Sequence, residues 1–427
     1  MTLYLKNATY INWKTLEFKK SHLAVSEQKE NNLECIDSIP TSETLSDLDI
    51  VVDCDNRFVT RSFGCGHHHI YSTLARGMPA PSKTPENFLE ILKYVWWNLD
   101  KNLDLEMIRA SALASALFCA KNGVTFIIDH HASPFAVENS LKTIKESFDA
   151  VGVSSLLCYE MSDRNSNAVR EAGLEETENF LKNGNQGLVG LHASFTVGND
   201  LLEKAVDLTA KYNSGLHVHV AEDQSDQDHC LKQYNQRVLN RFSEAGVLDF
   251  PKTILGHCLH LDEQEREICR NSKAWIVENI ESNLNNNVGL TDYGKYGKNI
   301  MLGTDGMHSD MLRSAKAAFF NGQPTENISF PDIYQRFRNV HRYLAENQFQ
   351  GDGDNNLVVL DYDTPTEINK DNFLGHFVFG IESKHVESVI ANGKLIVKNR
   401  KLLTMNEEEI LSLSRKKSVE LWRRLKS

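Results

Sequence analysis

The sequence predicts an α/β fold in which eight parallel strands close into a barrel, with smaller β-rich segments at both chain ends. Eight short apolar runs recur between residues 61 and 306, and most end in polar residues. Amphipathic helical patterns separate most of these runs. Strands buried on both faces and alternating with helices are typical of a parallel sheet, and eight such units in succession suit a closed barrel.

The eight runs are RSFGCGHHH (61–69), GVTFIIDHH (123–131), VSSLLCYE (153–160), GLVGLHASFT (187–196), GLHVHVAE (215–222), KTILGHCLH (252–260), KAWIVENI (273–280) and NIMLGTDG (299–306). Between them, residues 141–151 and 201–212 have clear helical spacing, whereas residues 281–298 show no clear helix. A doubly wound open sheet is the alternative architecture. It is less favoured because no GxGxxG follows any run.

The chain ends have a different pattern. Residues 3–11, 49–55 and 355–362 read as strands, and 387–399 as two strands joined at Asn392-Gly393. A helix rich in Glu and Lys closes the chain, and GDGDNN (351–356) marks a boundary. We therefore expect three segments, 1–58, 59–350 and 351–427, with the barrel in the middle one.

Composition limits the function classes. The 427 residues carry a formal net charge of −12, which argues against a nucleic-acid or anionic-membrane partner because either needs a basic face. The N-terminus lacks the apolar core of a signal peptide, and no stretch approaches the ~20 apolar residues of a membrane span. Eight scattered cysteines without a CxxC pair suit free thiols in a reducing compartment. The cytoplasm is the expected location.

Histidines and carboxylates follow the first, fifth and eighth runs, at the strand ends that form the mouth of an α/β barrel. Alternation along a strand places His67 and His69 on one side. The fifth run supplies His219 and the eighth ends in Asp305. Three nitrogens and one carboxylate, with an open position for water, suit a catalytic metal such as zinc.

Each element alone has a simpler interpretation. An HxH pair is more often a surface or packing feature, and His219 alone could be a hydrogen-bonded core histidine. Asp305, in GTDG, could be a helix cap or a turn residue. Their shared location at one mouth favours the metal site.

These motifs resemble the amidohydrolase superfamily, specifically its aminohydrolase and chlorohydrolase branch, and within it the SsnA-type aminohydrolases. The resemblance covers nearly the whole chain. It rests on HHHIYSTLARGMP (67–79), DHHASP (129–134), LCYEMSDRN (157–165), GLHASFT (190–196), HVHVAED (217–223), LGHCLHLDEQE (255–265), SNLNNNVG (282–289) and LGTDG (302–306).

The resemblance implies a distorted TIM barrel with a small β-sandwich domain built from both chain ends, and a homodimer. The implied metal ligands are His67, His69, His219 and Asp305. By the same resemblance, Glu222 is the proton-shuttling acid of an HxxE motif. His257 polarises the attacking water or the substrate, and His192 lies in the substrate pocket.

The chain departs from the family pattern in two places. Arg61 to Gly66 replace the usual Pro-Gly-Phe approach to the first strand, and Glu278 to Glu281 replace the usual His-Asn-Pro near the seventh. We expect the second departure to put an extra carboxylate, Glu278, near the mouth. Both departures make transfer of a substrate from any relative unsafe.

Binuclear members of the superfamily that the chain resembles bridge two metals with a carboxylated lysine on the fourth strand. The fourth run here has no lysine, so the resemblance implies one divalent ion per chain, with zinc preferred and iron as the alternative. Such an ion lowers the pKa of a bound water toward ~7 and so provides hydroxide for attack. Asp305 and His257 are expected to accept the proton. Glu222 is expected to protonate a ring nitrogen and help ammonia leave.

Three further residues are candidates for contact with the substrate. Tyr71, Arg164 and Asn283 are expected to contact it, although surface or structural roles suit them equally well. Trp96 and Trp97 are more simply explained by packing or a subunit contact than by substrate stacking.

Three functions compete. The first is hydrolytic deamination of a purine- or pyrimidine-like heterocycle, in the class of hydrolases acting on cyclic amidines. The second is another hydrolysis at the same site, by dehalogenation or C–N ring opening. The third is a non-catalytic protein that binds a metal or ligand, which the presence of every ligand and of the acid disfavours.

Overall fold

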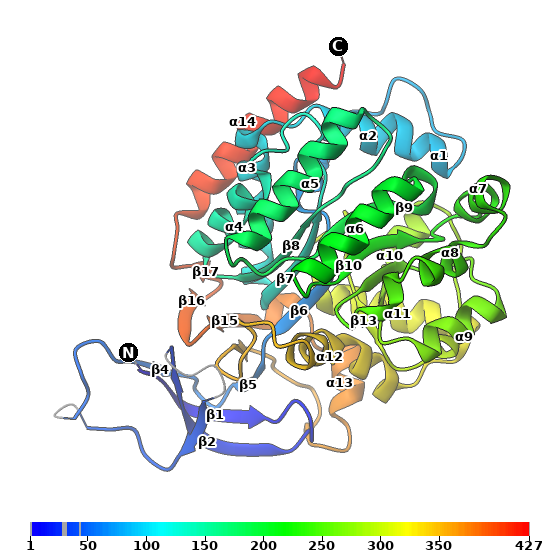
Figure 1. Ribbon diagram of the computed structural model, residues 1–427. Helices are drawn as coiled ribbons and strands as arrows, with labels where there is room; N and C mark the ends of the chain where they lie inside the picture. Colours follow the sequence, from blue (N-terminus) through cyan, green and yellow to red (C-terminus); the bar gives the residue numbers. More distant parts are fainter. Residues whose placement is uncertain (1, 28–31, 42–43, 427) are drawn as a thin grey trace.

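A computed structural model describes residues 2–27, 32–41 and 44–426, and in it each of the eight predicted runs contains a strand (Figure 1). The predicted α/β barrel is therefore confirmed. Its strands are β6 (Phe63–His68), β7 (Val124–His131), β8 (Ser154–Tyr159), β9 (Val189–Ala193), β10 (Leu216–Val220), β11 (Ile254–His257), β12 (Trp275–Glu278) and β13 (Ile300–Leu302).

The barrel is distorted, because its strands form two parallel arcs that meet at narrow seams. One arc has the order β6-β7-β8 and the other β13-β12-β11-β10-β9. At one seam, single bridges join Leu157 to Gly187 and Met161 to Leu191. At the other, His68 bridges to Asp305, and the amides of Thr304 and Asp305 both donate to the carbonyl of His67. The second seam therefore lies at the predicted metal ligands.

Helices surround the strands, and the two helices predicted from spacing form at α4 and α6. The longer connection between β12 and β13 holds only short helical turns, as its sequence indicates. The helices are α1 (Phe88–Ile91), α2 (Trp97–Lys101), α3 (Leu105–Lys121), α4 (Ser140–Val151), α5 (Asn167–Lys182), α6 (Asn199–Lys211), α7 (Gln224–Tyr234), α8 (Val238–Glu244), α9 (Glu263–Asn271), α10 (Ile280–Asn285), α11 (Met311–Glu326) and α12 (Phe330–Glu346).

The barrel interior is filled from the end opposite the mouth. Buried side chains of β7, β8, β11, β12 and β13 form one cluster with Val340, Tyr343 and Leu344 of α12. Gly64 permits this approach, since a Cβ there would lie 2.8 Å from Val340. This packed floor lies at one end of the barrel, and the cavity lined by His69, His219 and Asp305 lies at the other.

The two chain ends form one mixed sheet beside the barrel, as the resemblance implies (Figure 1). The predicted turn at Asn392-Gly393 joins β15 to β16, with both residues at positive φ. One face of the sheet encloses its own apolar cluster, which includes Leu3, Leu23 and Val359. Its strands are β1 (Thr2–Ile11), β2 (Phe18–Ser26), β3 (Leu33–Ile36), β4 (Ile50–Asp53), β5 (Phe58–Arg61), β14 (Leu357–Leu360), β15 (Val386–Ala391), β16 (Lys394–Lys398) and β17 (Lys401–Leu402).

Two helices tie this sheet domain and the chain end to the barrel. Helix α13 (Phe373–Phe379) packs on α12, and α14 (Glu407–Arg424) runs along α3. The Trp422 indole donates to the carbonyl of Leu74, in the short 3-10 helix (Ile70–Ala75) that follows the first barrel strand. Among the described residues, no helix is long and apolar enough to cross a membrane.

Candidate active site

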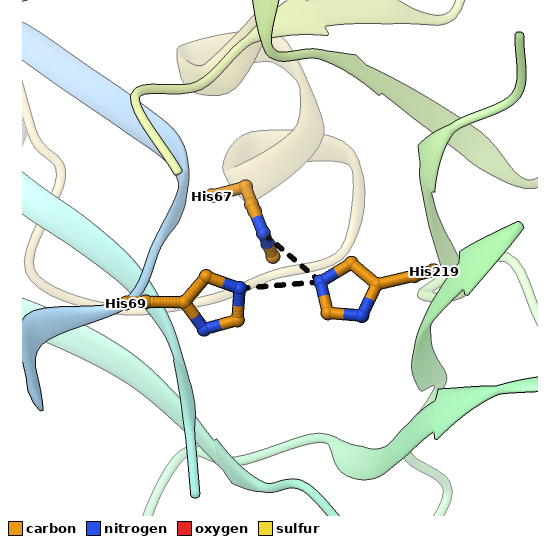
Figure 2. Close-up of side chains that lie close together, drawn as sticks. All are labelled: His67, His69 and His219. Atoms are coloured by element: carbon orange, nitrogen blue, oxygen red, sulfur yellow. Dashed lines mark hydrogen bonds between the residues drawn. The ribbon is translucent and has the colours of Figure 1, made fainter. Parts of the chain in front are cut away.

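Three histidines from β6, its end and β10 point toward one another at the mouth (Figure 2). The Nε2 atom of His219 lies 3.2 Å from that of His69 and 3.3 Å from that of His67. Tetrahedral ligands at the usual zinc distances are separated by about 3.3 Å. All three side chains are buried, so the nitrogens already have a spacing that fits one ion.

The seam between β6 and β13 brings the fourth oxygen to this group. Asp305 Oδ1 lies 3.1 Å from Nε2 of His69 and 3.7 Å from Nε2 of His67. The close approach depends on glycine: a Cβ at Gly303 would lie 2.9 Å from the Cβ of His67, and one at Gly66 would lie 2.8 Å from the carbonyl of Leu302. The same backbone pairing that joins β6 to the end of β13 therefore also brings Asp305 to the histidines.

Backbone carbonyls orient two of the three imidazoles. His69 donates from Nδ1 to the carbonyl of His130 at 2.6 Å, and His219 donates from Nδ1 to the carbonyl of His192 at 2.9 Å. Each bond fixes the tautomer whose Nε2 lone pair faces the centre. His67 is held through Nδ1 by His217, at 2.9 Å, which extends the histidine network behind the site.

Burial keeps most of these rings neutral, which is the form that binds metals. Burial lowers the pKa of His67 to about 3 and that of His219 well below its usual value. His69 differs, because against the effect of burial the hydrogen bond that it donates to the Asp305 carboxylate raises its pKa to about 9. The pKa of Asp305 is lowered by hydrogen bonds from His67 and His69, which outweigh its own burial. These nitrogen and oxygen atoms fit a divalent cation as ligands, and such a cation would replace the proton that His69 shares with Asp305.

Glu222 and His257 flank the centre on the β10–β11 side. His257 Nε2 lies 3.5 Å from Glu222 Oε2 and 3.7 Å from Asp305 Oδ2, and it has no hydrogen-bond partner among the described residues. Its Nδ1 donates to Asn283 Oδ1 at 2.7 Å, which leaves the Nε2 lone pair facing the centre. Burial and the charge of Asp305 raise the pKa of Glu222. A carboxyl that holds its proton more tightly than usual can act as an acid.

A cavity opens at this centre, and several predicted residues line it. Its wall includes His69, Asp305, Glu222, Tyr71 and His192, together with Phe88, Leu92, Trp96, Trp97, Asp100, Glu160, Ser282, Asn286 and Gly306. Trp96 and Trp97, for which packing or a subunit contact is the simpler expectation, border this cavity and also pack against the apolar core. Trp96 ends a π-helical turn (Leu92–Trp96) and Trp97 begins α2, so regular helical spacing in the sequence did not predict that they border the cavity.

Arg164 and Asn283 lie behind the cavity, although the sequence suggested direct contact with substrate. Arg164 pairs with Asp100 Oδ2 at 2.5 Å and with Glu160 Oε1 at 3.4 Å. Both carboxylates line the cavity and were missed, because isolated acids after a strand and on a helix carry no distinctive spacing. The motif LCYEMSDRN contained the only sequence signal for Glu160.

Glu278 corrects a further expectation. Its side chain faces the helix layer, where it accepts from Arg336 of α12 at 3.1 Å, and Glu326 shares that guanidinium. The neighbouring interior positions of β12 are Trp275 and Val277, so alternation turns Glu278 away from the barrel axis. The departure near the seventh strand therefore places its carboxylate outside the mouth.

The chain belongs to the amidohydrolase family, whose sequence model matches residues 58–335. Fold and donor set together define a metal-dependent hydrolase, as the sequence predicted. The match covers every barrel strand and ends within α12.

Curated relatives extend the similarity over most of the chain. It is 26% identical over 401 residues to a 5'-deoxyadenosine deaminase of Methanosphaera stadtmanae, covering 88% of this chain and 91% of the relative. It is 28% identical over 349 residues to a 5-methylthioadenosine/S-adenosylhomocysteine deaminase of Pelotomaculum thermopropionicum, covering 76% and 78%. Among solved structures, an adenosine deaminase of Xanthomonas campestris with bound zinc superposes with a TM-score of 0.82 at 16% identity, covering 98% of both chains.

Proposed function

We propose that this protein is a hydrolytic deaminase that replaces the amino group of a purine- or pyrimidine-like heterocycle with oxygen and releases ammonia. The observation that carries the proposal is the placement of Glu222. Its buried carboxyl has a raised pKa, lines the cavity and faces His257 beside the metal donors. Curated relatives that are named as deaminases of adenine nucleosides support the same chemistry.

In this proposal, His67, His69, His219 and Asp305 hold one divalent ion, with zinc preferred and iron as the alternative. Four nitrogen and oxygen donors with a vacant position suit a catalytic ion of this kind. When bound, the ion supplies a water that is activated for attack near neutral pH.

The chain's own residues move the protons. His257 accepts a proton at Nε2, the atom that Asn283 leaves free, and Asp305 Oδ2 lies beside it. Glu222 gives its proton to the ring nitrogen next to the reacting carbon, which lowers the cost of breaking the aromatic C=N bond. The proton gained by Asp305 or His257 then passes to the amino group, which leaves as ammonia when the C–N bond breaks, and the proton of the newly added hydroxyl returns to Glu222 as the carbonyl forms.

The cavity wall positions the heterocycle. Tyr71 and His192 contact it directly, and Trp96 and Trp97 exclude water above it. Arg164 and Asn283 act one step removed, through the Asp100–Glu160 carboxylates and through His257, respectively. Adenine nucleosides such as 5'-deoxyadenosine are the first substrates to test, because the curated relatives are named for them.

Closer affiliation with the SsnA-type aminohydrolases, a homodimer and a cytoplasmic location remain predictions. The substrate class is tested by measuring ammonia release from a panel of purines, pyrimidines and adenine nucleosides, with product masses. Replacement of NH2 by OH supports deamination. Loss of halide or gain of water with no ammonia would favour dehalogenation or ring opening, and inactivity toward every class with full metal loading would favour a non-catalytic protein.

A further inference from the structure

Part of the segment between β6 and α3 crosses the mouth of the barrel, and we call its residues 79–101 the strap. Its helices are α1 and α2, joined by a π-helical turn. The Trp96 ring reaches the loop after β13, because a Cβ at Gly306 would lie 3.2 Å from Trp96 Cη2. The centre of the Trp97 ring lies 6.0 Å from that of His192 on β9. The strap therefore contacts both sides of the mouth.

The strap leaves little room beneath it. The cavity at the metal donors has a volume of about 50 Å³, whereas sites that bury a small ligand usually hold roughly 300–1,000 Å³. The strap contributes Phe88, Leu92, Trp96 and Trp97 to the wall of this cavity. A purine- or pyrimidine-like heterocycle therefore needs the strap to move outward before it can enter, and the structure shows the closed form.

One side chain makes the polar contact that keeps the strap in this position. Among the described residues, the only hydrogen bond or ion pair that joins the strap to a barrel strand, helix or loop outside the β6–α3 segment runs from Arg164 Nη2 to Asp100 Oδ2, at 2.5 Å. The Arg164 guanidinium also lies 5.2 Å from the centre of the Trp97 ring. On its other side, Arg164 pairs with Glu160 Oε1 at 3.4 Å and donates to Ser162 Oγ at 3.1 Å. Arg164 thus connects the strap to the end of β8.

Helix α14 fixes the chain on both sides of the strap. Before it, Trp422 donates to the carbonyl of Leu74 at 2.9 Å, and after it, Arg424 donates to the carbonyl of Asn102 at 2.9 Å. Gly77 lies between the first anchor and the strap. Its φ of +76° is in the left-handed region, and a Cβ there would meet nothing within 4 Å, so its backbone can rotate freely. Movement is therefore confined to the residues between the two anchors.

We propose that Arg164 is a positioning residue that holds the strap closed over the active site. It pairs with the Asp100 carboxylate and contacts the Trp97 ring through a cation–π interaction, while Glu160 fixes the guanidinium to the barrel. This inference rests on the proposed deaminase function, because the closed strap is what separates a bound heterocycle from water.

A weaker contact at Arg164 has a defined consequence. The strap would spend more time in the open form, in which the cavity lacks the wall formed by Trp96 and Trp97. The apparent affinity for a substrate falls in proportion to the fraction of molecules that are closed. The groups that carry out the reaction stay in place, because Arg164 contacts neither the metal ligands nor Glu222 in the described chain.

Hydrogen–deuterium exchange of the full chain loaded with Zn²⁺ tests the role of Arg164 without any substrate. Arg164→Gln should raise the exchange rate of residues 88–101 by more than about tenfold, because helical amides exchange when the segment opens. Helix α14 should keep its rate. An unchanged rate in residues 88–101 would overturn the proposal. A similar increase in α12 and α14 would also overturn it, since it would indicate a general loss of stability.

Arg170→Gln is the matched control. Arg170 lies on α5 and forms ion pairs with Asp163, Glu171 and Asp200, but in the described chain it makes no ion pair or hydrogen bond with the strap. Exchange in residues 88–101 should therefore stay at the rate of the unaltered protein. Equal acceleration in this variant and in Arg164→Gln would contradict a specific role for Arg164.

Two further variants sharpen the test. Arg164→Lys keeps the positive charge but loses the planar fork that reaches two carboxylates and covers Trp97, so its exchange rate should lie between the other two. Should Arg164→Gln not fold, Asp100→Asn weakens the same ion pair from the strap side and leaves Arg164 paired with Glu160. Exchange in residues 88–101 should again be faster, and an unchanged rate would overturn the proposal.

Once a substrate is identified, KM and kcat separate this role from a merely structural one. Arg164→Gln should raise KM about tenfold and change kcat less than about threefold, because the reaction takes place in the closed form. A lower kcat at an unchanged KM would indicate a loss of active molecules and would contradict the proposal. If no heterocycle is turned over while exchange still distinguishes the variants, the deaminase proposal fails and the role of Arg164 stands.

Discussion

Two buried glutamates, Glu265 and Glu160, differ in how their carboxylates are hydrogen-bonded. Glu265, on α9, accepts from the Arg237 guanidinium at 2.7 Å, from the backbone amides of Leu239 and Asp262, and from the Gln227 amide. Glu160, at the mouth, has one guanidinium at 3.4 Å and the Nδ1 atom of His130 at 3.3 Å. Several donors hold the Glu265 carboxylate at short distances, whereas the partners of the Glu160 carboxylate lie farther away, at 3.3 and 3.4 Å.

The two regions differ in the role of their charged groups. Those around Glu265 stabilise the fold, whereas those at the mouth are arranged to bind a ligand. A buried carboxylate contributes to a stable fold only when donors compensate its lost hydration. The cluster around Glu265 does so and links α7, α8 and α9. At the mouth, nitrogen and oxygen atoms of His67, His69, His219 and Asp305 lie close together, and few hydrogen-bond donors separate them. Such a region is stable when a cation binds.

The largest expected effect falls on the mouth and concerns rate. Glu222→Gln keeps the size of the side chain but removes the acid, so turnover of an identified substrate should fall about 10²- to 10⁴-fold. Metal content should not change, because Glu222 is not a ligand. Steady-state ammonia release with parallel metal analysis measures both. Full activity in this variant would remove Glu222 from the mechanism.

Metal binding should stabilise the whole protein. At a free Zn²⁺ concentration about 1,000 times the dissociation constant, the free energy of unfolding should rise by about 4 kcal/mol, because the unfolded chain has no assembled site. Thermal unfolding of chelator-treated protein with and without Zn²⁺ measures this. His219→Asn should show a much smaller rise. An equal rise in that variant would mean that zinc stabilises the fold from another position.

The cluster around Glu265 should show the opposite pattern. Glu265→Ala leaves the buried backbone amide of Leu239 without its acceptor and removes one of the two carboxylates paired with Arg237, which should cost about 3 kcal/mol of unfolding free energy. Metal content and the rate per folded molecule should stay the same. Urea unfolding followed by circular dichroism measures the loss. If turnover fell while stability held, the proposed division between the two regions would be wrong.

The smallest effect concerns pH. Burial lowers the pKa of His131 to about 3, so the folded ring stays neutral while the unfolded ring gains a proton below ~6.5. Folding stability is therefore complete above ~6.5 and is lost as the pH falls. His131 should account for about 2 kcal/mol of that loss at pH 5. Urea unfolding at pH 7 and pH 5 should show a smaller difference in His131→Asn, and an unchanged difference would exclude this histidine.

The sequence was sufficient for the barrel and for its metal donors, for a physical reason. Period-two and helical spacing report which face of an element is buried, and strand ends in a barrel share one mouth. His67, His69, His219 and Asp305 could therefore be grouped without coordinates. The turn at Asn392-Gly393 was equally readable, because few residue pairs adopt positive φ at both positions.

Side chains that act through a second residue could not be found in this way. Glu278 points outward because it alternates with Trp275 and Val277 along β12, but its partner Arg336 comes from α12, and the sequence does not reveal that contact. Asp100 and Glu160 meet only because Arg164 joins a helix to a strand end. Trp97 borders the cavity from the start of α2, directly after a π-helical turn whose irregular spacing a sequence pattern does not reveal. Such relations depend on tertiary contacts between segments far apart in the chain.

The seam between the first and last barrel strands, β6 and β13, sets when the metal site can form during synthesis of the chain. His67 emerges early in synthesis, whereas Asp305 pairs with it only after every intervening strand has been translated and docked. Incomplete chains can present two or three imidazoles but not the finished donor set. Stable metal capture is therefore a late event in biogenesis, and metal retention can serve as a test of whether a molecule has completed its barrel.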